Sequence, residues 1–375
     1  MRNIHLLRQL SLPLAALMLL VVLGNTIQIA SLLPVFESKL VEAKELARPA
    51  EVGITLLTTG TCTNCFNISP VENLIANSGI NVTSRTAVDI SSEQAKELIA
   101  LYEIERIPTL ILTGEINKTS ILKGELKEMG EVRSDAFVYT SIPPPYYSPQ
   151  DQKIVGMVSL YIVDPVACDI CPDLSSLVDS LEQAGVVFQG RTYVLADSDE
   201  GRSLISRYSL ERLPALIMDS EILSYSALQS GLAKVGSYGS DGTYVMQPMS
   251  APYFDLNKRK EQGLVSVTFL TDGSCQDCYD PALFHKPILQ NLGVVITKES
   301  TVDSSSVAGK QMISAYNISL VPALLLKGDA DAYPSLVGAW KSVGTVESDG
   351  TFVFRRVDLA KKAYKNIVTG DVIKP

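Results

Sequence analysis

Six cysteines are the residues of this 375-residue chain best suited to chemistry. They form three C-x-x-C pairs with none left over: Cys62/Cys65, Cys168/Cys171 and Cys275/Cys278. A thiolate is the nucleophile of disulfide exchange, and a second thiol close behind it can attack the mixed disulfide and release the product. The pattern therefore favours thiol–disulfide exchange, in which the first cysteine of each pair attacks and the second resolves.

The rest of the composition leaves little material for other chemistry. The chain has only two histidines, His5 and His285, so a Ser/His/Asp triad or a multi-histidine metal centre is not expected. We expect His285 to be a packing or surface residue. Lys and Arg total 32 against 41 Asp and Glu, and this net charge of -9 argues against nucleic-acid binding. The sequence indicates no cofactor.

The cysteine pairs recur with the period of a small domain, because their first cysteines lie 106 and 107 residues apart. A second marker keeps the same register: a proline 46, 46 or 47 residues after the first cysteine, six residues after a tyrosine. These pairs are Tyr102 and Pro108, Tyr208 and Pro214, and Tyr316 and Pro322. The repeat predicts three tandem copies of one domain, at residues 34–143, 144–250 and 251–375. Proline-rich or charged linkers are expected at 142–146 and 251–260.

Each copy has the same predicted order of elements around its cysteines. A buried strand precedes each pair, at 53–59, 158–163 and 265–270, and a helix follows it, at 70–76, 174–181 and 282–289. A second strand, a second helix and a strand directly after the proline complete the copy. Helical crossovers between strands predict an α/β fold with a mixed central sheet flanked by helices. The first cysteine should then lie at a helix N-terminus, where the helix dipole lowers the pKa of its thiol.

In combination, these motifs resemble the thioredoxin-like superfamily. The stretch YEIERIPTLIL, residues 102–112, is similar to the sequence around the cis-proline in that superfamily. The resemblance covers about residues 50–375 in three copies. It implies three tandem thioredoxin-like domains, although Thr61, Ala167 and Ser274 stand where thioredoxins have Trp.

The resemblance also implies a substrate-binding edge beside each cysteine pair. The peptide bonds before Pro108, Pro214 and Pro322 should be cis and should pack against the sulfurs. A cis bond exposes the backbone of the preceding residue, where an extended substrate could add as a strand. The residues expected to bind substrate in this way are Ile107 and Pro108, Leu213 and Pro214, and Val321 and Pro322.

The N-terminus carries a membrane signal. Residues 10–33 are mostly apolar, follow Arg2 and Arg8, and are about long enough to span a hydrocarbon core as a helix. An anchor over residues 1–33 is favoured because the apolar character resumes at 27–33, where a mature N-terminus usually turns polar. A cleaved signal peptide and a buried core helix are the alternatives. The basic flank predicts a single-pass protein with its C-terminal domains outside the cytoplasm.

The residues between the cysteines differ in charge. Thr63 and Asn64 are neutral, whereas Asp169 adjoins Cys168 and Asp277 adjoins Cys278. A carboxylate beside a thiolate disfavours it, so the first site should have the most acidic nucleophile and the highest reduction potential.

The sequence as a whole predicts a membrane-anchored thiol–disulfide oxidoreductase. Its expected partners are cysteine-containing exported proteins, a possible membrane redox partner, and the membrane itself through residues 10–33. The main alternative is a redox-inactive thioredoxin-fold binding or scaffold protein of the cell envelope, whose disulfides serve only stability. Zinc shared between domains and the handling of a soft ion such as Cu(I) are further alternatives.

Overall fold

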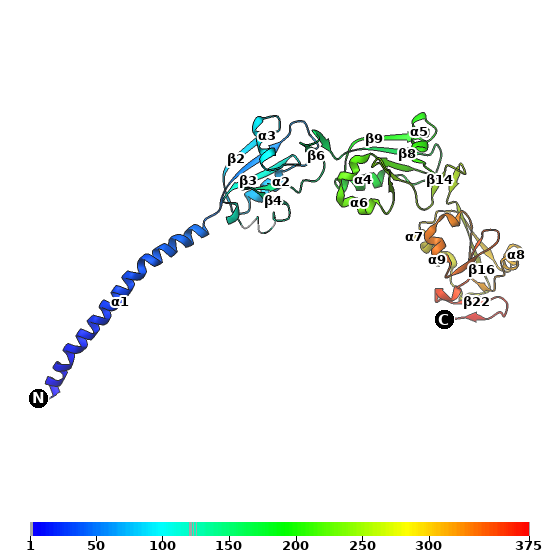
Figure 1. The fold of residues 1–375 in the computed structure, drawn as a ribbon. Coiled ribbons are helices and arrows are strands. Elements are labelled where there is room, and N and C mark those ends of the chain that lie inside the picture. The colour runs from blue at the N-terminus through cyan, green and yellow to red at the C-terminus, as the bar shows by residue number, and fades with distance from the viewer. Residues whose placement is uncertain (1–2, 120–121, 123, 125, 375) are drawn as a thin grey trace. The chain divides into compact units, whose positions relative to one another are not determined.

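A computed structural model describes residues 3–119, 122, 124 and 126–374 (Figure 1). The chain divides into two compact units, one with the described residues up to Ile142 together with Tyr147–Gln152, the other with Pro143–Tyr146 and the residues from Lys153 onward. The first unit contains one five-stranded sheet and the second contains two. Each of these sheets is built from one copy of the sequence repeat, and we call the copies the first, second and third domains.

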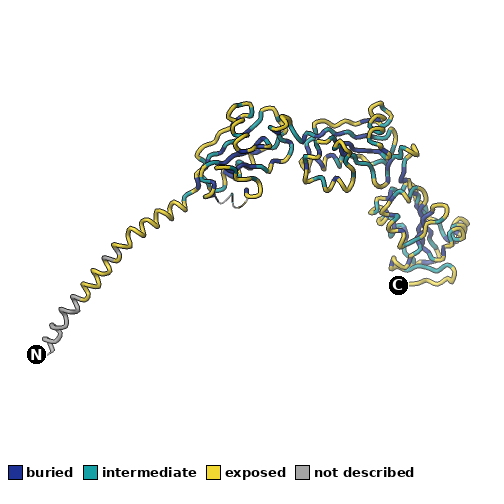
Figure 2. Tube along the Cα trace, viewed as in Figure 1, coloured by how far each residue is buried: buried dark blue, intermediate teal, exposed yellow. Residues whose placement is uncertain are grey.

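The chain begins with a long helix, α1 (Asn3–Ala47). Its large apolar side chains, among them Leu17, Leu20 and Phe36, are exposed, and Figure 2 shows the described part of the helix mostly in the colour of exposed residues. From Leu17 onward the helix is long and apolar enough to cross a membrane. It continues past residue 33 to Ala47 because the segment after Phe36 is rich in Glu, Lys, Ala and Leu, which are strong helix formers.

The first domain has the sheet order β2-β1-β3-β5-β4, in which β1 and β2 are parallel and all other neighbours antiparallel. The predicted strand–helix–strand–helix–strand order is confirmed. The elements are β1 (Glu51–Thr58), α2 (Ser69–Ala76), β2 (Asn81–Asp89), α3 (Glu93–Leu101), β3 (Thr109–Gly114), the short helix η1 (Ile116–Lys118), β4 (Gly130–Arg133) and β5 (Ala136–Tyr139).

The second domain repeats this plan with the sheet order β12-β13-β11-β8-β9. Its only parallel pair among the described strands is again the first two strands of the domain, β8 and β9. Its elements are β8 (Met157–Asp164), α4 (Ser175–Gln183), β9 (Val187–Leu195), α5 (Asp199–Tyr208), β10 (Arg212–Leu213), β11 (Ala215–Met218), η3 (Ser220–Ser224), α6 (Ser226–Leu232), β12 (Ser237–Tyr238) and β13 (Tyr244–Met246).

The third domain has the sheet order β17-β16-β19-β21-β20, with β16 and β17 parallel. Its elements are β16 (Val265–Thr271), α7 (Pro281–Asn291), β17 (Ile296–Asp303), α8 (Val307–Tyr316), β18 (Leu320–Val321), β19 (Ala323–Gly328), η4 (Ala330–Ala332), α9 (Pro334–Trp340), β20 (Gly344–Val346), β21 (Phe352–Phe354) and η5 (Val357–Ala360). The α/β class predicted from the sequence, a mixed sheet flanked by helices in three copies, is confirmed.

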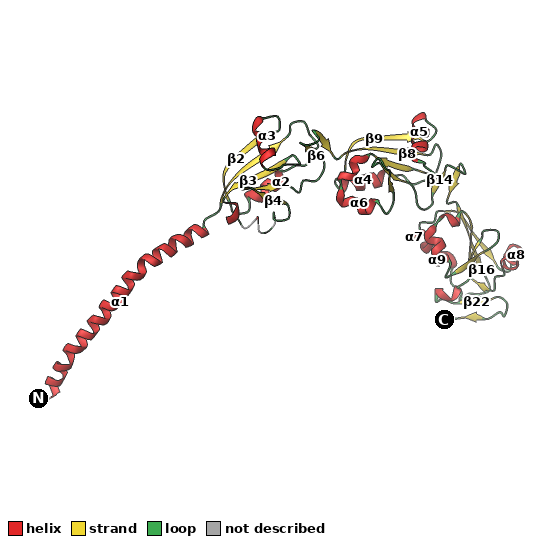
Figure 3. Cartoon of the chain, in the orientation of Figure 1, coloured by secondary structure: helices red, strands yellow, loops and turns green. Residues whose placement is uncertain are grey.

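Helices cover both faces of each sheet (Figure 3). In the third domain, Leu289 of α7 and Trp340 of α9 pack in one apolar cluster with Phe269 of β16. The next residue of that strand, Leu270, points to the opposite face and packs there with Ile313 of α8. The alternation along β16 thus builds two apolar layers, and the end of the strand is fixed where the cysteine pair follows.

The segments predicted as plain linkers contain short strands instead. The first, 142–146, ends at the start of β6 (Tyr146–Ser148), which pairs with β7 (Lys153–Val155). The second, 251–260, contains β14 (Tyr253–Asp255) and the start of β15 (Lys260–Gln262), which form a hairpin. The third domain is followed by a comparable hairpin of β22 (Tyr364–Asn366) and β23 (Val372–Ile373). The proline and charge content of these segments hid their strand character. Each strand is only two or three residues long, and one strand of each pair adds to a distant edge.

Candidate functional site

All six cysteines form disulfides within their C-x-x-C pairs: Cys62–Cys65, Cys168–Cys171 and Cys275–Cys278. The two Cα atoms are 5.4 Å apart in every pair, which is within the range that a disulfide spans without backbone movement. Each pair lies in the turn between the first strand of its domain and the helix that follows. Among the described residues, no group of three or more His, Cys, Asp or Glu side chains is placed to hold a metal ion.

The prediction that the first cysteine lies at a helix N-terminus is wrong. Helices α2, α4 and α7 begin at Ser69, Ser175 and Pro281, several residues after their cysteine pairs. In the third domain the cause is visible: the Asp280 side chain accepts hydrogen bonds from the amides of Ala282 and Leu283 and so fixes the helix start. The helix dipole acts within one turn of the helix start, so the predicted effect of the dipole on the first cysteine does not apply.

The peptide bonds Ile107–Pro108, Leu213–Pro214 and Val321–Pro322 are cis. In the second domain, the Leu213 carbonyl oxygen lies 3.8 Å from the Cys171 sulfur. The cis-proline segment and the disulfide therefore face each other there, although they are 42 residues apart in sequence. Two other cis bonds, Pro144–Pro145 and Ala251–Pro252, lie in the linking segments and were not predicted.

All three domains share the same sheet order with one parallel pair among the described strands. Each also has a disulfide after its first strand and a cis-proline at the start of its third long strand. The three domains have the thioredoxin-like fold. No protein-family model and no curated protein sequence matches the chain.

Three of the solved structures that are similar to the chain have low sequence identity to it. They are ERdj5 form II (12% identity, 75% of this chain and 38% of that chain, TM-score 0.15), a protein disulfide oxidoreductase from Aeropyrum pernix k1 (14%, 49% and 82%, 0.13) and human ERp44 (10%, 80% and 86%, 0.14). The chain covers 38% of the ERdj5 structure's length. The thioredoxin-like fold is assigned from the sheets and turns of the three domains themselves.

The backbone expected to receive substrate is already paired within the chain. Ile107 exchanges both of its backbone hydrogen bonds with Tyr147, at 3.0 and 2.8 Å. Leu213 pairs with Phe254 of β14, and Val321 pairs with Lys365 of β22. A substrate strand would have to displace these segments to add at the same edge. The sequence contained no signal for this, since each partner comes from a different short strand beyond the domain's own sheet.

Carboxylates gather at the second site. Glu261 of β15 accepts a hydrogen bond from the amide of Asp169, at 2.9 Å, directly after Cys168. On the strand side, burial raises the pKa of Asp164, which lies four residues before Cys168, and nearby Asp173 raises it further. Asp164 was missed at the sequence level; its signal was a charged residue ending an otherwise apolar strand. At this site, the carboxylates of Asp169 and Glu261 disfavour a negative charge on Cys168. The third carboxylate, Asp164, retains its proton more readily than an ordinary aspartate.

The third site pairs its carboxylates with lysines. Lys365 lies 2.9 Å from Asp272 and 2.7 Å from the Ser274 hydroxyl, and Lys374 lies 2.6 Å from Asp277. Burial raises the pKa of Asp272, but hydrogen bonds from Ser274 and Lys365 outweigh it, so the net shift is downward. Asp277 thus faces a lysine in this domain, although both side chains are mostly exposed.

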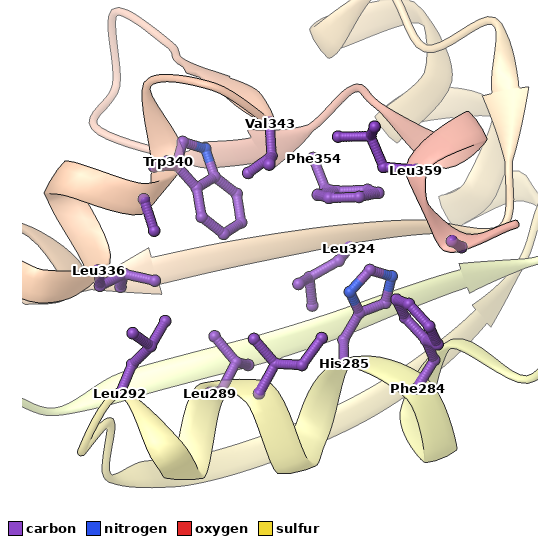
Figure 4. A pocket seen from close by; sticks show the side chains of 13 residues that line it. Phe284, His285, Leu289, Leu292, Leu324, Leu336, Trp340, Val343, Phe354 and Leu359 are labelled. Atoms are coloured by element: carbon purple, nitrogen blue, oxygen red, sulfur yellow. The ribbon is translucent and has the colours of Figure 1, made fainter.

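An apolar pocket of about 220 Å³ lies in the third domain (Figure 4). Figure 4 shows α7 side chains, including Leu289 and His285, facing Trp340 and Phe354 across it. The His285 ring is 3% exposed, packs edge-on against Phe354 and hydrogen-bonds the Tyr279 hydroxyl at 3.1 Å. No lining residue belongs to the cysteine pair or the cis-proline segment, so His285 is a packing residue, one of the two roles expected for it.

His285 should make the third domain sensitive to mild acid. Burial lowers the pKa of His285 from 6.5 to about 4, so between these values the unfolded chain binds a proton that the folded domain does not. The free energy of unfolding should therefore fall by about 2 kcal/mol between pH 7 and pH 5. Urea unfolding of the third domain, followed by the fluorescence of Trp340, measures it. A His285→Leu variant should lose this pH dependence, and an unchanged slope in that variant would assign the effect to other groups.

Proposed function

We propose that the chain is a membrane-anchored thiol–disulfide oxidoreductase that acts on cysteine-containing exported proteins. The observation that carries the proposal is the set of three C-x-x-C disulfides, each in the turn before a helix of a thioredoxin-like domain that also has a cis-proline at the start of its third strand. Three sites in tandem suit repeated exchange or a relay between the domains and a membrane redox partner.

In the reduced form, the first cysteine of a pair attacks one sulfur of a substrate disulfide. A mixed disulfide forms and one substrate thiolate leaves. The second cysteine, deprotonated, then attacks the first, and the other substrate thiolate leaves. Two electrons and two protons have passed from the domain's dithiol to the substrate, so the substrate is reduced and the domain is oxidised. The same steps in reverse oxidise a substrate dithiol and reduce the domain.

The proposed anchor is α1, and its support is a helix that is apolar and long enough to span a bilayer. Basic residues Arg2 and Arg8 precede the apolar run, which favours a cytoplasmic N-terminus and domains on the other side. A location outside the cytoplasm would also suit six cysteines that are all in disulfides, because reducing compartments keep thiols reduced.

Removing residues 1–33 should release the protein from membranes without altering its domains. The reason is that exposed apolar side chains are dense between Leu17 and Leu33, in the described part of this segment, whereas those of the three domains are scattered. Fractionation into membrane and soluble parts, with circular dichroism of the soluble part, measures the change. A truncated chain that still needs detergent would contradict the anchor.

The redox proposal is tested by an exchange assay on the full chain in detergent, with a fluorescently quenched peptide that carries one disulfide. The wild-type protein, reduced beforehand, should cleave the peptide disulfide at a rate well above that of a variant with all six cysteines replaced by serine. Equal rates would favour the redox-inactive scaffold. That alternative also needs the cis-proline edges for peptide binding, and these edges are occupied within the chain.

A further inference from the structure

The β22–β23 hairpin contacts the turn that holds the third cysteine pair on both sides of Cys275. The amide of Tyr279 donates to the carbonyl oxygen of Ala363 at 3.1 Å, just after the pair. Just before it, the Lys365 ammonium reaches Ser274 at 2.7 Å, as well as Asp272. Cys275 is 8% exposed, whereas Cys62 and Cys168 are partly exposed. The hairpin thus occupies both the strand-pairing edge and the surroundings of the attacking sulfur.

Lys365 enters a site that is built for a basic side chain. Its side chain is 19% exposed and that of Asp272 is 9% exposed, so both charges have lost most of their water. The ammonium is compensated by the Asp272 carboxylate at 2.9 Å and the Ser274 hydroxyl at 2.7 Å. A lysine is rarely buried to this degree unless it is paired. The hairpin forms another ion pair, between Lys374 and Asp277. Their side chains are 65% and 61% exposed, so this pair has kept most of its water.

The three domains provide an internal comparison of this position. Three residues before the first cysteine, the first and second domains have Thr59 and Pro165, and the third has Asp272. The residue paired with the one before the cis-proline is aromatic in the first two domains and basic in the third. These partners are Tyr147, Phe254 and Lys365. The acid and the base appear together in one domain and are absent together from the other two.

We propose that the hairpin is an intramolecular mimic of the third domain's substrate, and that this site binds extended segments with Lys or Arg at the position that pairs with Val321. The proposal rests on the proposed function, which gives the site a substrate. A substrate strand replaces β22, pairs with Leu320 and Val321, and places its basic side chain against Asp272. The hairpin competes for the same edge and so keeps the third site closed to segments that lack the basic residue.

The test uses binding rather than exchange, so that it does not depend on redox activity. The probe is a fluorescent synthetic peptide of residues 363–374, which contains no cysteine, and a second version with the Lys365→Met change. The full chain in detergent carries Lys365→Met, which weakens its own hairpin without removing it. This variant should bind the lysine peptide about tenfold more tightly than the methionine peptide, as expected for a charge-assisted hydrogen bond. The wild-type chain should bind both peptides weakly.

Two further variants separate a specific site from general attraction. Adding Asp272→Asn to the Lys365→Met chain should abolish the preference for the lysine peptide. The matched control, Lys374→Met, removes the exposed lysine and should leave wild-type behaviour unchanged. Hydrogen exchange of β16 and β19 checks that every variant retains its sheet. Equal affinities for the two peptides, or a preference that survives Asp272→Asn, would overturn the proposal.

A folded Lys365→Met chain that binds neither peptide would also overturn it. Because the probes contain no cysteine, peptide binding without disulfide exchange would instead contradict the redox function and leave the binding edge intact.

Discussion

Replacing the resolving cysteines by serine should convert transient encounters into stable mixed disulfides. Without Cys65, Cys171 or Cys278, the attacking cysteine still forms its bond to a substrate sulfur, but no neighbouring thiol can release it. Release then depends on a thiol from solution, and loss of an intramolecular attack should lengthen the life of the adduct by about a hundredfold or more. Non-reducing electrophoresis of each variant, after reduction and mixing with a disulfide-bonded protein, measures the adduct.

Matched variants show whether the adduct follows the proposed roles. Cys62→Ser, Cys168→Ser or Cys275→Ser, each combined with its resolving replacement, should form no adduct at the altered site. The third domain should trap less than the first, because Cys275 is 8% exposed beneath the hairpin. The absence of any adduct from all three resolving variants would favour the scaffold alternative.

The second site should have the lowest reduction potential of the three. Asp169 adjoins Cys168, and Glu261 lies 2.9 Å from the Asp169 amide, so two carboxylates oppose a thiolate there. The first site has neutral Thr63 and Asn64 between its cysteines. A stabilised thiolate favours the reduced form, so the first pair should be the more oxidising by about 30 mV, or about tenfold in the equilibrium constant.

Equilibration of the full chain in one glutathione buffer, followed by alkylation and mass spectrometry of each pair, measures this order. Asp169→Asn should raise the potential of the second pair, whereas Asp179→Asn, which changes an exposed residue of α4, should not. A second pair that is more reduced than the first in this buffer, and so has the higher potential, would contradict the role assigned to Asp169. At the third site, Lys374 forms an exposed ion pair with Asp277, which reduces the opposing charge that the sequence analysis expected there.

The sequence predicted well the features that depend on short local patterns and recur in all three copies. The cysteine spacing, the register of Pro108, Pro214 and Pro322, and the apolar strands before each pair led to the three sheets and their helices. The features it missed depend on contacts between distant residues. Lys365 and Asp272 are 93 positions apart, and no local pattern connects them.

Each helix starts within one residue of its predicted position, and the error lay in expecting the first cysteine at that start. The apolar periodicity after the cysteines was correct, and in the third domain the cap Asp280 fixes the first turn beyond the cysteine pair. The strand that contains Tyr253 and Phe254 was also missed. Its strand partners lie outside the five-stranded sheet of the repeat, so the repeat pattern gave no sign of it.

A redox titration of the three disulfides in the native full chain tests the central claim most directly. Structural disulfides have potentials below about −300 mV, whereas exchangeable ones lie higher. We expect at least the Cys62–Cys65 pair to titrate above that value without denaturant, as followed by alkylation of the freed thiols. If all three pairs remained oxidised until the domains unfolded, the disulfides would be structural and the oxidoreductase account would be wrong.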